Sequence, residues 1–160
     1  MEIHGSERLR QLLELTAKED RHLMEVRRRL LGGQTKVDAN WLLKTLRTPE
    51  GIDRLESFGT KFARLQDTLV DKLLPALLLQ AGERPGAAID NLNRAERLGL
   101  VSDVDQWLAA RRLRNRLVHE YMEDPEDMAA ALTEASHFTD TMHQARERIS
   151  TYTHRHLQGY

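Results

Sequence analysis

The residue types best suited to chemistry lie between Arg114 and Tyr121, where Arg114, His119 and Tyr121 have the spacing R-x4-H-x-Y. Arginine presents a planar fork of donors that fits phosphate, and histidine is the side chain that titrates near neutral pH and can pass a proton there. Four arginines crowd the turns before the histidine, and such a patch can hold the backbone of RNA or DNA by charge alone: Arg111, Arg112, Arg114 and Arg116. The pattern therefore favours chemistry on a phosphodiester.

Helix geometry limits how these residues can act together. Arg114 and His119 are five residues apart, so on an ideal helix they project about 140° apart, whereas Asn115 and His119 share a face. Either the helix distorts at its end, or two copies of the motif face each other in a dimer. We favour the dimer because it doubles the positive charge in one cleft. There His119 would act as general base or acid on the ribose 2′-hydroxyl or the leaving oxygen, and Arg114 would stabilise charge on phosphorus.

The composition predicts one domain spanning residues 1–160, since a chain of this length buries roughly 70% of its extended surface. Charged residues make up 31% and apolar residues 40%, which is typical of a folded soluble protein. The net charge is −1, so any contact with nucleic acid must come from a local patch. The sequence has no cysteine, no signal-peptide pattern and no apolar stretch long enough for a bilayer. We therefore expect a soluble, cytoplasmic protein with no membrane contact.

Hydrophobic periodicity predicts an all-α fold, a bundle of five or six helices. A first apolar stripe is closed by Gly32-Gly33. Asp38 is the predicted cap of a short helix over 39–47. Thr48-Pro49-Glu50 then begins a long third helix, which Pro75 is expected to kink or end.

A fourth helix is predicted over 87–98, followed by the helix that carries the motif. Ser102, with Asp105 three residues later, is the predicted cap of this fifth helix. It should end near Tyr121, because Asp124-Pro125-Glu126 is a typical start for the last helix. The regular apolar seam of that last helix indicates ordinary core rather than a partner surface.

The motif, with Asn115 directly after the arginine and Tyr121 two residues after the histidine, resembles the HEPN superfamily and within it the HepT-like toxins. HEPN proteins are helical and carry an R-x4-6-H motif, often with a polar residue after the arginine, and R-x4-H-x-Y is typical of HepT. The resemblance extends over about 48–132 and includes Arg64-Leu65-Gln66-Asp67 on the third helix. The first 45 residues have no counterpart beyond one long helix.

The resemblance implies a HEPN-like homodimer that cleaves RNA without metal or cofactor, using Arg114 and His119 with help from Asn115. It also implies an antitoxin partner from the minimal nucleotidyltransferase family, which can attach AMP to the motif tyrosine, here Tyr121. An adenylate would bring negative charge and bulk into a basic cleft and so exclude RNA. The sequence departs from this expectation in its acidic run over 120–127, which would repel phosphate unless it points away.

Other interpretations of the motif stay open. Arg114 and His119 could form a surface ion network with Glu120 and Glu123, and Tyr121 could simply close the helix as a half-buried ring. The chain would then be a non-catalytic helical partner that docks a nucleotidyltransferase, or a plain scaffold.

Two further clusters of polar side chains also allow a functional and a structural interpretation. Asp67 and Asp71 share a polar stripe of the third helix and could border the cleft as acidic partners of the motif, or face solvent. The spacing of His137, Asp140 and His143 suggests metal ligands, but on a helix they spread over more than about 100°. We therefore predict no metal site.

Overall fold

The computed structural model describes the backbone of residues 2–119 and 124–157, and the side chains of residues 5–117 and 124–157. Within these ranges the chain is helical and has no strand. If residues 49–80 are taken as one interrupted helix, the described chain forms six helices, so the predicted all-α bundle is confirmed. The elements are α1 (Glu2–Leu31), α2 (Ala39–Thr45), α3 (Pro49–Thr68), the π-helical turn η1 (Leu69–Leu73), α4 (Leu74–Gln80), α5 (Ala88–Arg97), α6 (Val104–His119) and α7 (Pro125–His156).

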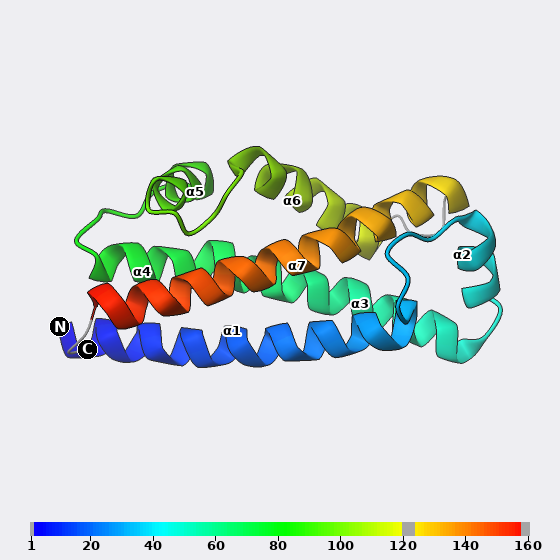
Figure 1. Ribbon diagram of the computed structural model, residues 1–160, viewed down its shortest axis with the longest axis horizontal. Helices are drawn as coiled ribbons and strands as arrows, with labels where there is room; N and C mark the ends of the chain where they lie inside the picture. The colour runs from blue at the N-terminus through cyan, green and yellow to red at the C-terminus, as the bar shows by residue number, and fades with distance from the viewer. Residues whose placement is uncertain (1, 120–123, 158–160) are drawn as a thin grey trace.

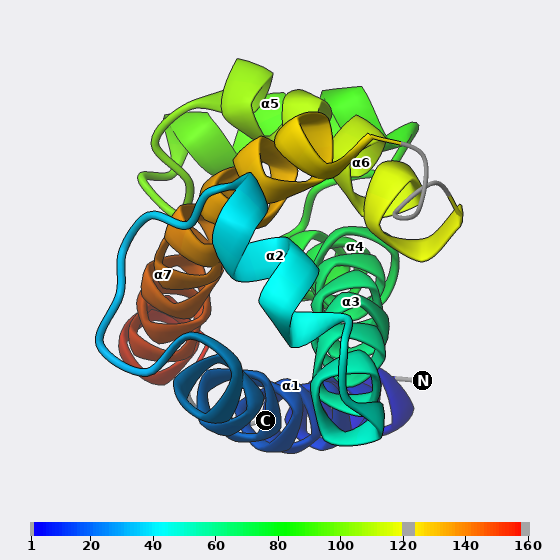
Figure 2. The ribbon, with the colours of Figure 1, turned by 90° about the vertical axis from the view of Figure 1, so that its right-hand side faces the viewer.

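Three long helices lie side by side and form most of the bundle: α1, the continuous α3–η1–α4 helix, and α7 (Figure 1). The shorter α5 and α6 pack along one side of these helices, and α2 lies across one end of the bundle (Figure 2). The core joins α3, α6 and α7 through three buried rings. Phe138 meets Phe62 and Trp107 edge to face, with ring centroids 6.2 and 4.9 Å apart. Trp107 thereby holds α6, the helix of the motif, against the bundle.

Most helix boundaries follow local signals in the sequence. Gly32 adopts a φ of 63° where α1 ends, a left-handed conformation that glycine adopts at little cost. The side chains of Asp38, Thr48 and Asp124 accept backbone N–H groups in the first turns of α2, α3 and α7. These predicted starts and stops are confirmed.

The start of α6 differs from the prediction. The carboxylate of Asp103 accepts the N–H of Gln106 at 3.3 Å, and the helix begins at Val104. The predicted Ser102 cap is therefore wrong, because a cap at Ser102 would need the helix to begin one residue earlier. The acid predicted for the first turn, Asp105, does lie there.

Pro75 does not end the long helix. The π-helical turn η1 precedes it, and the N–H of Leu74 bonds to the carbonyl of Leu69, five residues back. In a regular α-helix the proline ring would clash with the carbonyl four residues before it. A wider turn at this point relieves the clash, so the helix continues as α4 to Gln80.

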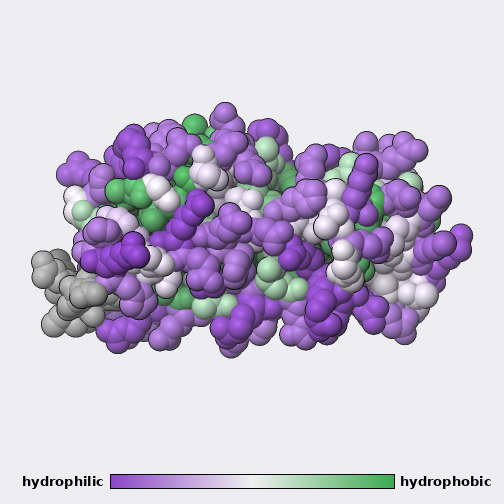
Figure 3. All heavy atoms as spheres, viewed as in Figure 1, coloured by the Kyte–Doolittle hydropathy of each residue, from purple (hydrophilic) through white to green (hydrophobic). Residues whose placement is uncertain are grey.

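The surface carries few large apolar side chains, and they are spread over several elements. Figure 3 shows a face dominated by hydrophilic residues, with small hydrophobic areas between them. The exposed ones are Leu15, Leu43, Leu79, Ile89 and Leu98. The seam of α7 is buried from Met128 to Ile149, as predicted for ordinary core. Across the described ranges, no helix combines the length and the apolar character needed to cross a bilayer.

Candidate functional site

The motif arginine is fixed against the last turn of α3. Nη2 of Arg114 lies 2.7 Å from Oδ2 of Asp67, and Nε lies 3.1 Å from Oδ1, so the guanidinium grips both oxygens of one carboxylate. This bidentate pair joins residues 47 positions apart in the sequence, and bidentate geometry fixes orientation as well as distance. Of the two alternatives left open for Asp67, partner of the motif or solvent-facing acid, the structure shows a contact with Arg114.

The residue after the arginine adds a third bond. Nη1 of Arg114 donates to Oδ1 of Asn115 at 2.9 Å. A guanidinium carries five N–H donors, of which three are engaged here and two have no acceptor within residues 5–117 and 124–157. The side chain of Arg114 is 29% exposed, which leaves those two donors within reach of a phosphate.

A parallel ion pair lies one turn away. Arg111 donates to Asp71, which belongs to η1. The two pairs and one lysine line a surface pocket of about 330 Å³. Its lining consists of Asp67, Asp71, Lys72, Arg111, Arg114 and Asn115. Sequence reasoning had not included Lys72, which reaches the site because η1 presents it beside Asp71.

The pocket is close to electrical neutrality. Its two carboxylates offset two of its three cationic side chains, which leaves a formal charge of +1. The hydrogen bond to Asp67 raises the pKa of Arg114 above its ordinary value, although burial opposes the shift. Arg112 and Arg116 are exposed and make no ion pair within the described residues. Within residues 5–117 and 124–157, the predicted arginine patch is therefore divided into a paired half, Arg111 and Arg114, and a half without ion pairs.

Helices α3 and α6 pack closely where the motif lies. A Cβ at Gly59 of α3 would lie 3.4 Å from the carbonyl oxygen of Leu117 of α6, an ordinary van der Waals distance. The ion pair of Arg114 and Asp67 joins the same two helices. The π turn follows directly after this contact, and π-helical turns inside α-helices frequently occur at functional sites.

The second half of the motif lies at the edge of the described chain. His119 is the last residue of α6, and its side chain is outside the described residues, as are Glu120, Tyr121 and Glu123. The backbone of α6 is helical up to His119. The end of the helix, where the distortion was expected, lies outside the described residues, so both ways of uniting the motif stay open.

The three residues of the rejected metal pattern turn to separate partners. His137 contacts a carbonyl of the α1–α2 loop, Asp140 pairs with Arg27, and His143 contacts Asp20. In the parts of the chain that the structure describes, no three His, Cys, Asp or Glu side chains are grouped so as to hold a metal ion.

Sequence reasoning missed a buried ionic cluster between α1 and α7. The Asp20 side chain is 3% exposed, and its Oδ2 lies 2.6 Å from Nδ1 of His143 and 2.8 Å from Nε of Arg146. The sequence contains one indication of this cluster. The acidic Asp20 lies within the apolar stripe of α1, between Thr16 and Leu23. The cluster clamps two long helices together.

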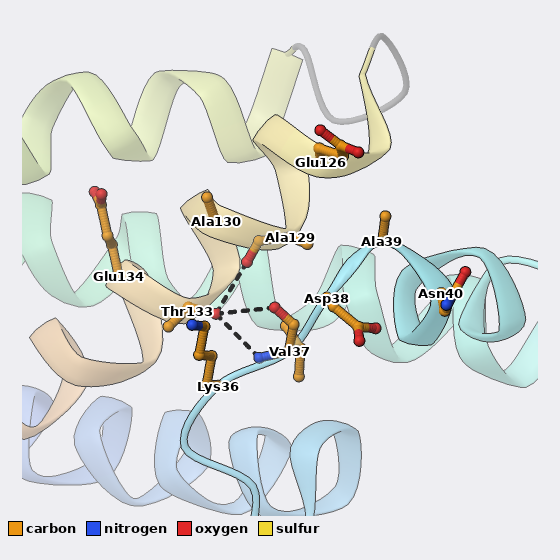
Figure 4. Close-up of a pocket in the computed structure, with 10 residues that line it drawn as sticks. All are labelled: Lys36, Val37, Asp38, Ala39, Asn40, Glu126, Ala129, Ala130, Thr133 and Glu134. Carbon is orange, nitrogen blue, oxygen red and sulfur yellow. Dashed lines mark hydrogen bonds between the residues drawn. The ribbon is translucent and has the colours of Figure 1, made fainter.

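A larger hollow of about 620 Å³ lies between the α1–α2 loop and the start of α7 (Figure 4). Thr133 ties this loop to α7 by accepting the N–H of Val37 at 3.1 Å. Its other lining includes two adjacent alanines of α7 and three carboxylates: Asp38, Glu126 and Glu134. The hollow contains no motif residue, and its negative charge disfavours phosphate.

Comparisons of the chain with protein-family models, curated proteins and solved structures found no match.

Proposed function

We propose that this chain is a metal-independent endoribonuclease toxin of the HEPN type, which acts as a homodimer and is restrained by a nucleotidyltransferase antitoxin. The observation that carries the proposal is the fixed guanidinium of Arg114, held by Asp67 and Asn115 with two donors left over. A catalytic arginine needs this arrangement, because a donor already oriented toward developing charge costs no reorganisation during the reaction.

The proposed reaction is a transesterification at phosphorus. His119 takes the proton of the ribose 2′-hydroxyl while that oxygen attacks phosphorus. The bond from phosphorus to the 5′-oxygen breaks, and the leaving oxygen takes a proton from His119 of the partner subunit. Arg114 stabilises the negative charge on the phosphoryl oxygens. The products are a 2′,3′-cyclic phosphate and a 5′-hydroxyl.

The dimer is part of the proposal because residues five apart on an ideal helix project about 140° apart, so two copies can unite the motif more easily than one. A second copy also adds its own exposed Arg112 and Arg116, which the neutralised pocket needs in order to attract RNA. The antitoxin would act at Tyr121, where a transferred adenylate places negative charge beside this arginine surface.

A specific observation favours the second candidate function, a non-catalytic partner that docks a nucleotidyltransferase. Three of the five Arg114 donors are already satisfied by Asp67 and Asn115, and the pocket carries a formal charge of only +1. An arginine with a purely structural role is expected to have its N–H donors engaged by protein acceptors in this way.

Cleavage of total RNA by the purified dimer in EDTA tests the first function. We expect the wild type to produce 2′,3′-cyclic phosphate ends and His119→Ala to produce none. His22→Ala, which removes an exposed histidine from α1, is the matched control and should cleave normally. If the folded, unmodified dimer cleaves no RNA, the binding module replaces the enzyme as the proposed function.

Intact mass tests the role of the tyrosine. Co-expression with the partner transferase should add one or more adenylates to the wild type and none to Tyr121→Phe. An unmodified wild type would remove the adenylation step while leaving the nuclease untouched.

A further inference from the structure

A second pocket lies on the opposite side of the bundle from Arg114. Its volume is about 330 Å³, and it sits between the C-terminal turns of α7 and the loop that joins α5 to α6. Figure 2 shows α7 and α3 on opposite sides of the bundle, so this pocket and the motif pocket do not merge. Its main lining side chains are Leu98, Leu100, Arg148, Tyr152, Arg155 and His156.

The cationic side chains of this pocket have no acidic partner that would explain them. Arg148 and Arg155 are exposed and form no ion pair within residues 5–117 and 124–157. None of the positions three or four residues from either arginine on the described part of α7 holds an acid. The helix dipole favours cations only in the last turn, which accounts for Arg155 but leaves Arg148, two turns earlier, unexplained.

The one carboxylate that lines the pocket is engaged elsewhere. Oε1 of Glu147 lies 3.3 Å from Nη2 of Arg146 and 3.5 Å from Nε2 of His143. Its charge is therefore shared with the buried ionic cluster of α1 and α7. Within the described ranges, the positive charges of the two arginines of the pocket are therefore not neutralised by an ion pair.

An aromatic surface lies between these two charges. Tyr152 is half-buried, and its ring packs on that of His156 with centroids 4.7 Å apart at 41°. Arg148 and Arg155 are seven residues apart, which places their backbones about 10 Å apart along the helix with Tyr152 between them. Leu98, 38% exposed, supplies an apolar wall from the opposite side.

Stacking rings flanked by free cations are the features that bind nucleotide units, with the base on the ring and the phosphate on a guanidinium. We propose that this pocket binds a phosphorylated nucleoside, with its base on Tyr152 and its phosphate on Arg148 or Arg155. The ligand is either a free mononucleotide or one nucleotide of a single strand, since both offer the same base and phosphate. The volume lies at the lower end of the range for small-ligand sites, as a single nucleotide requires.

The test uses the full-length protein and ligands that a 2′-hydroxyl mechanism does not cleave. Calorimetry measures binding of AMP and of inorganic phosphate, and fluorescence anisotropy measures a labelled ten-nucleotide thymidine DNA strand. Binding of AMP supports a free nucleotide, and binding of the strand alone supports a nucleotide within a chain. Because DNA lacks the 2′-hydroxyl, neither result depends on the proposed ribonuclease.

Three variants and one control make the test residue-specific. Tyr152→Leu keeps an apolar side chain on the core and removes the stacking ring, so we expect binding to weaken about 5- to 150-fold. Arg148→Gln and Arg155→Gln should weaken binding, and loss of a phosphate contact should lower the salt slope for the strand by about 0.7. Arg21→Gln, at an exposed position of α1 without an ion pair in the described chain, should change nothing.

Three results would overturn the proposal. One is a wild type that binds neither AMP nor the strand. Another is equal binding of AMP and inorganic phosphate, which would leave the ring without a role. The third is binding that Arg148→Gln and Arg155→Gln, both exposed substitutions that the fold tolerates, weaken no more than Arg21→Gln does.

Discussion

Replacing Asp67 with asparagine separates the two tasks of the Arg114 ion pair, helix attachment and arginine orientation. The Asp67→Asn amide keeps one acceptor for the guanidinium and loses the charge and the second acceptor. Both side chains remain in contact with water, at 29% and 40% exposure. The pair is therefore worth about 1 kcal/mol, the upper end for exposed ion pairs. In a domain of this size that loss lowers the melting temperature by about 2–4 °C.

The expected effect on cleavage is larger than the effect on stability. Without the bidentate grip the guanidinium can rotate away from the phosphate, and a misplacement near 1 Å costs up to about 100-fold in rate. We therefore expect Asp67→Asn to cleave RNA about 10- to 100-fold more slowly than the wild type. Thermal melting and single-turnover cleavage of a defined RNA measure the two effects on the same preparation.

The matched control is Asp140→Asn, which breaks an ion pair with Arg27 at 2.9 Å between α1 and α7. The side chains of Asp140 and Arg27 are 55% and 23% exposed, so the expected loss of stability is again about 1 kcal/mol. Its cleavage rate should equal that of the wild type. Normal cleavage by Asp67→Asn would refute the positioning role, and faster cleavage would show that the carboxylate restrains the arginine.

Three further substitutions test the physical reading of the fold by thermal melting. Asp20→Ala removes the buried carboxylate shared by His143 and Arg146 and leaves Arg146 only its pair with the exposed Glu147, which should cost about 3–5 kcal/mol, whereas a loss near 1 kcal/mol would mean that water reaches this cluster. Burial raises the pKa of Glu19 above its ordinary value, although a hydrogen bond and nearby cations oppose the shift. A raised carboxyl pKa stabilises the protonated fold at low pH, and this contribution is lost as the pH rises through the folded-state pKa. Glu19→Gln should therefore be more stable than the wild type at pH 7 and equal to it at pH 4, and a constant difference across that range would contradict the assignment. In Gly51→Ala the new Cβ would collide with the carbonyl oxygen of Thr45 at the α2–α3 turn, so the melting temperature should fall, while an unchanged value would mean that the turn can open.

The parts of the fold that sequence reasoning predicted are those encoded over a few residues. Thr48-Pro49-Glu50 combines a cap, a first-turn proline and a first-turn acid, and α3 begins there. The error at Ser102 has the same local origin. Two adjacent side chains could cap α6, and the carboxylate of Asp103 does so because the helix begins at Val104. Propensity at a cap does not by itself distinguish neighbours.

The parts that were missed depend on contacts between distant residues. Asp20 meets His143 and Arg146 across 123 and 126 positions, and no local pattern encodes those partners. The π-helical turn was missed because Pro75 was expected to kink or end the helix, although the chain can accommodate a proline by widening the turn before it. The Arg114–Asp67 pair was partly predictable. The sequence showed the polar stripe of α3 that contains Asp67, but several arginines of α6 could have been its partner.

Under the proposed function, the near-neutral charge of the motif pocket predicts that a single copy attracts RNA weakly. The pocket of each copy is lined by three cationic side chains, of which Asp67 and Asp71 neutralise two, and the exposed Arg112 and Arg116 lie on the same helix outside its lining. Fixing Arg114 in a catalytic orientation therefore costs the site attraction for phosphate, because the residue that orients the guanidinium also cancels its charge. Apposing a second copy restores that attraction without releasing the arginine, since it adds the exposed Arg112 and Arg116 of another α6. Orientation and attraction thus come from different residues, and the fold can supply both only if α6 faces another copy of itself or another basic surface.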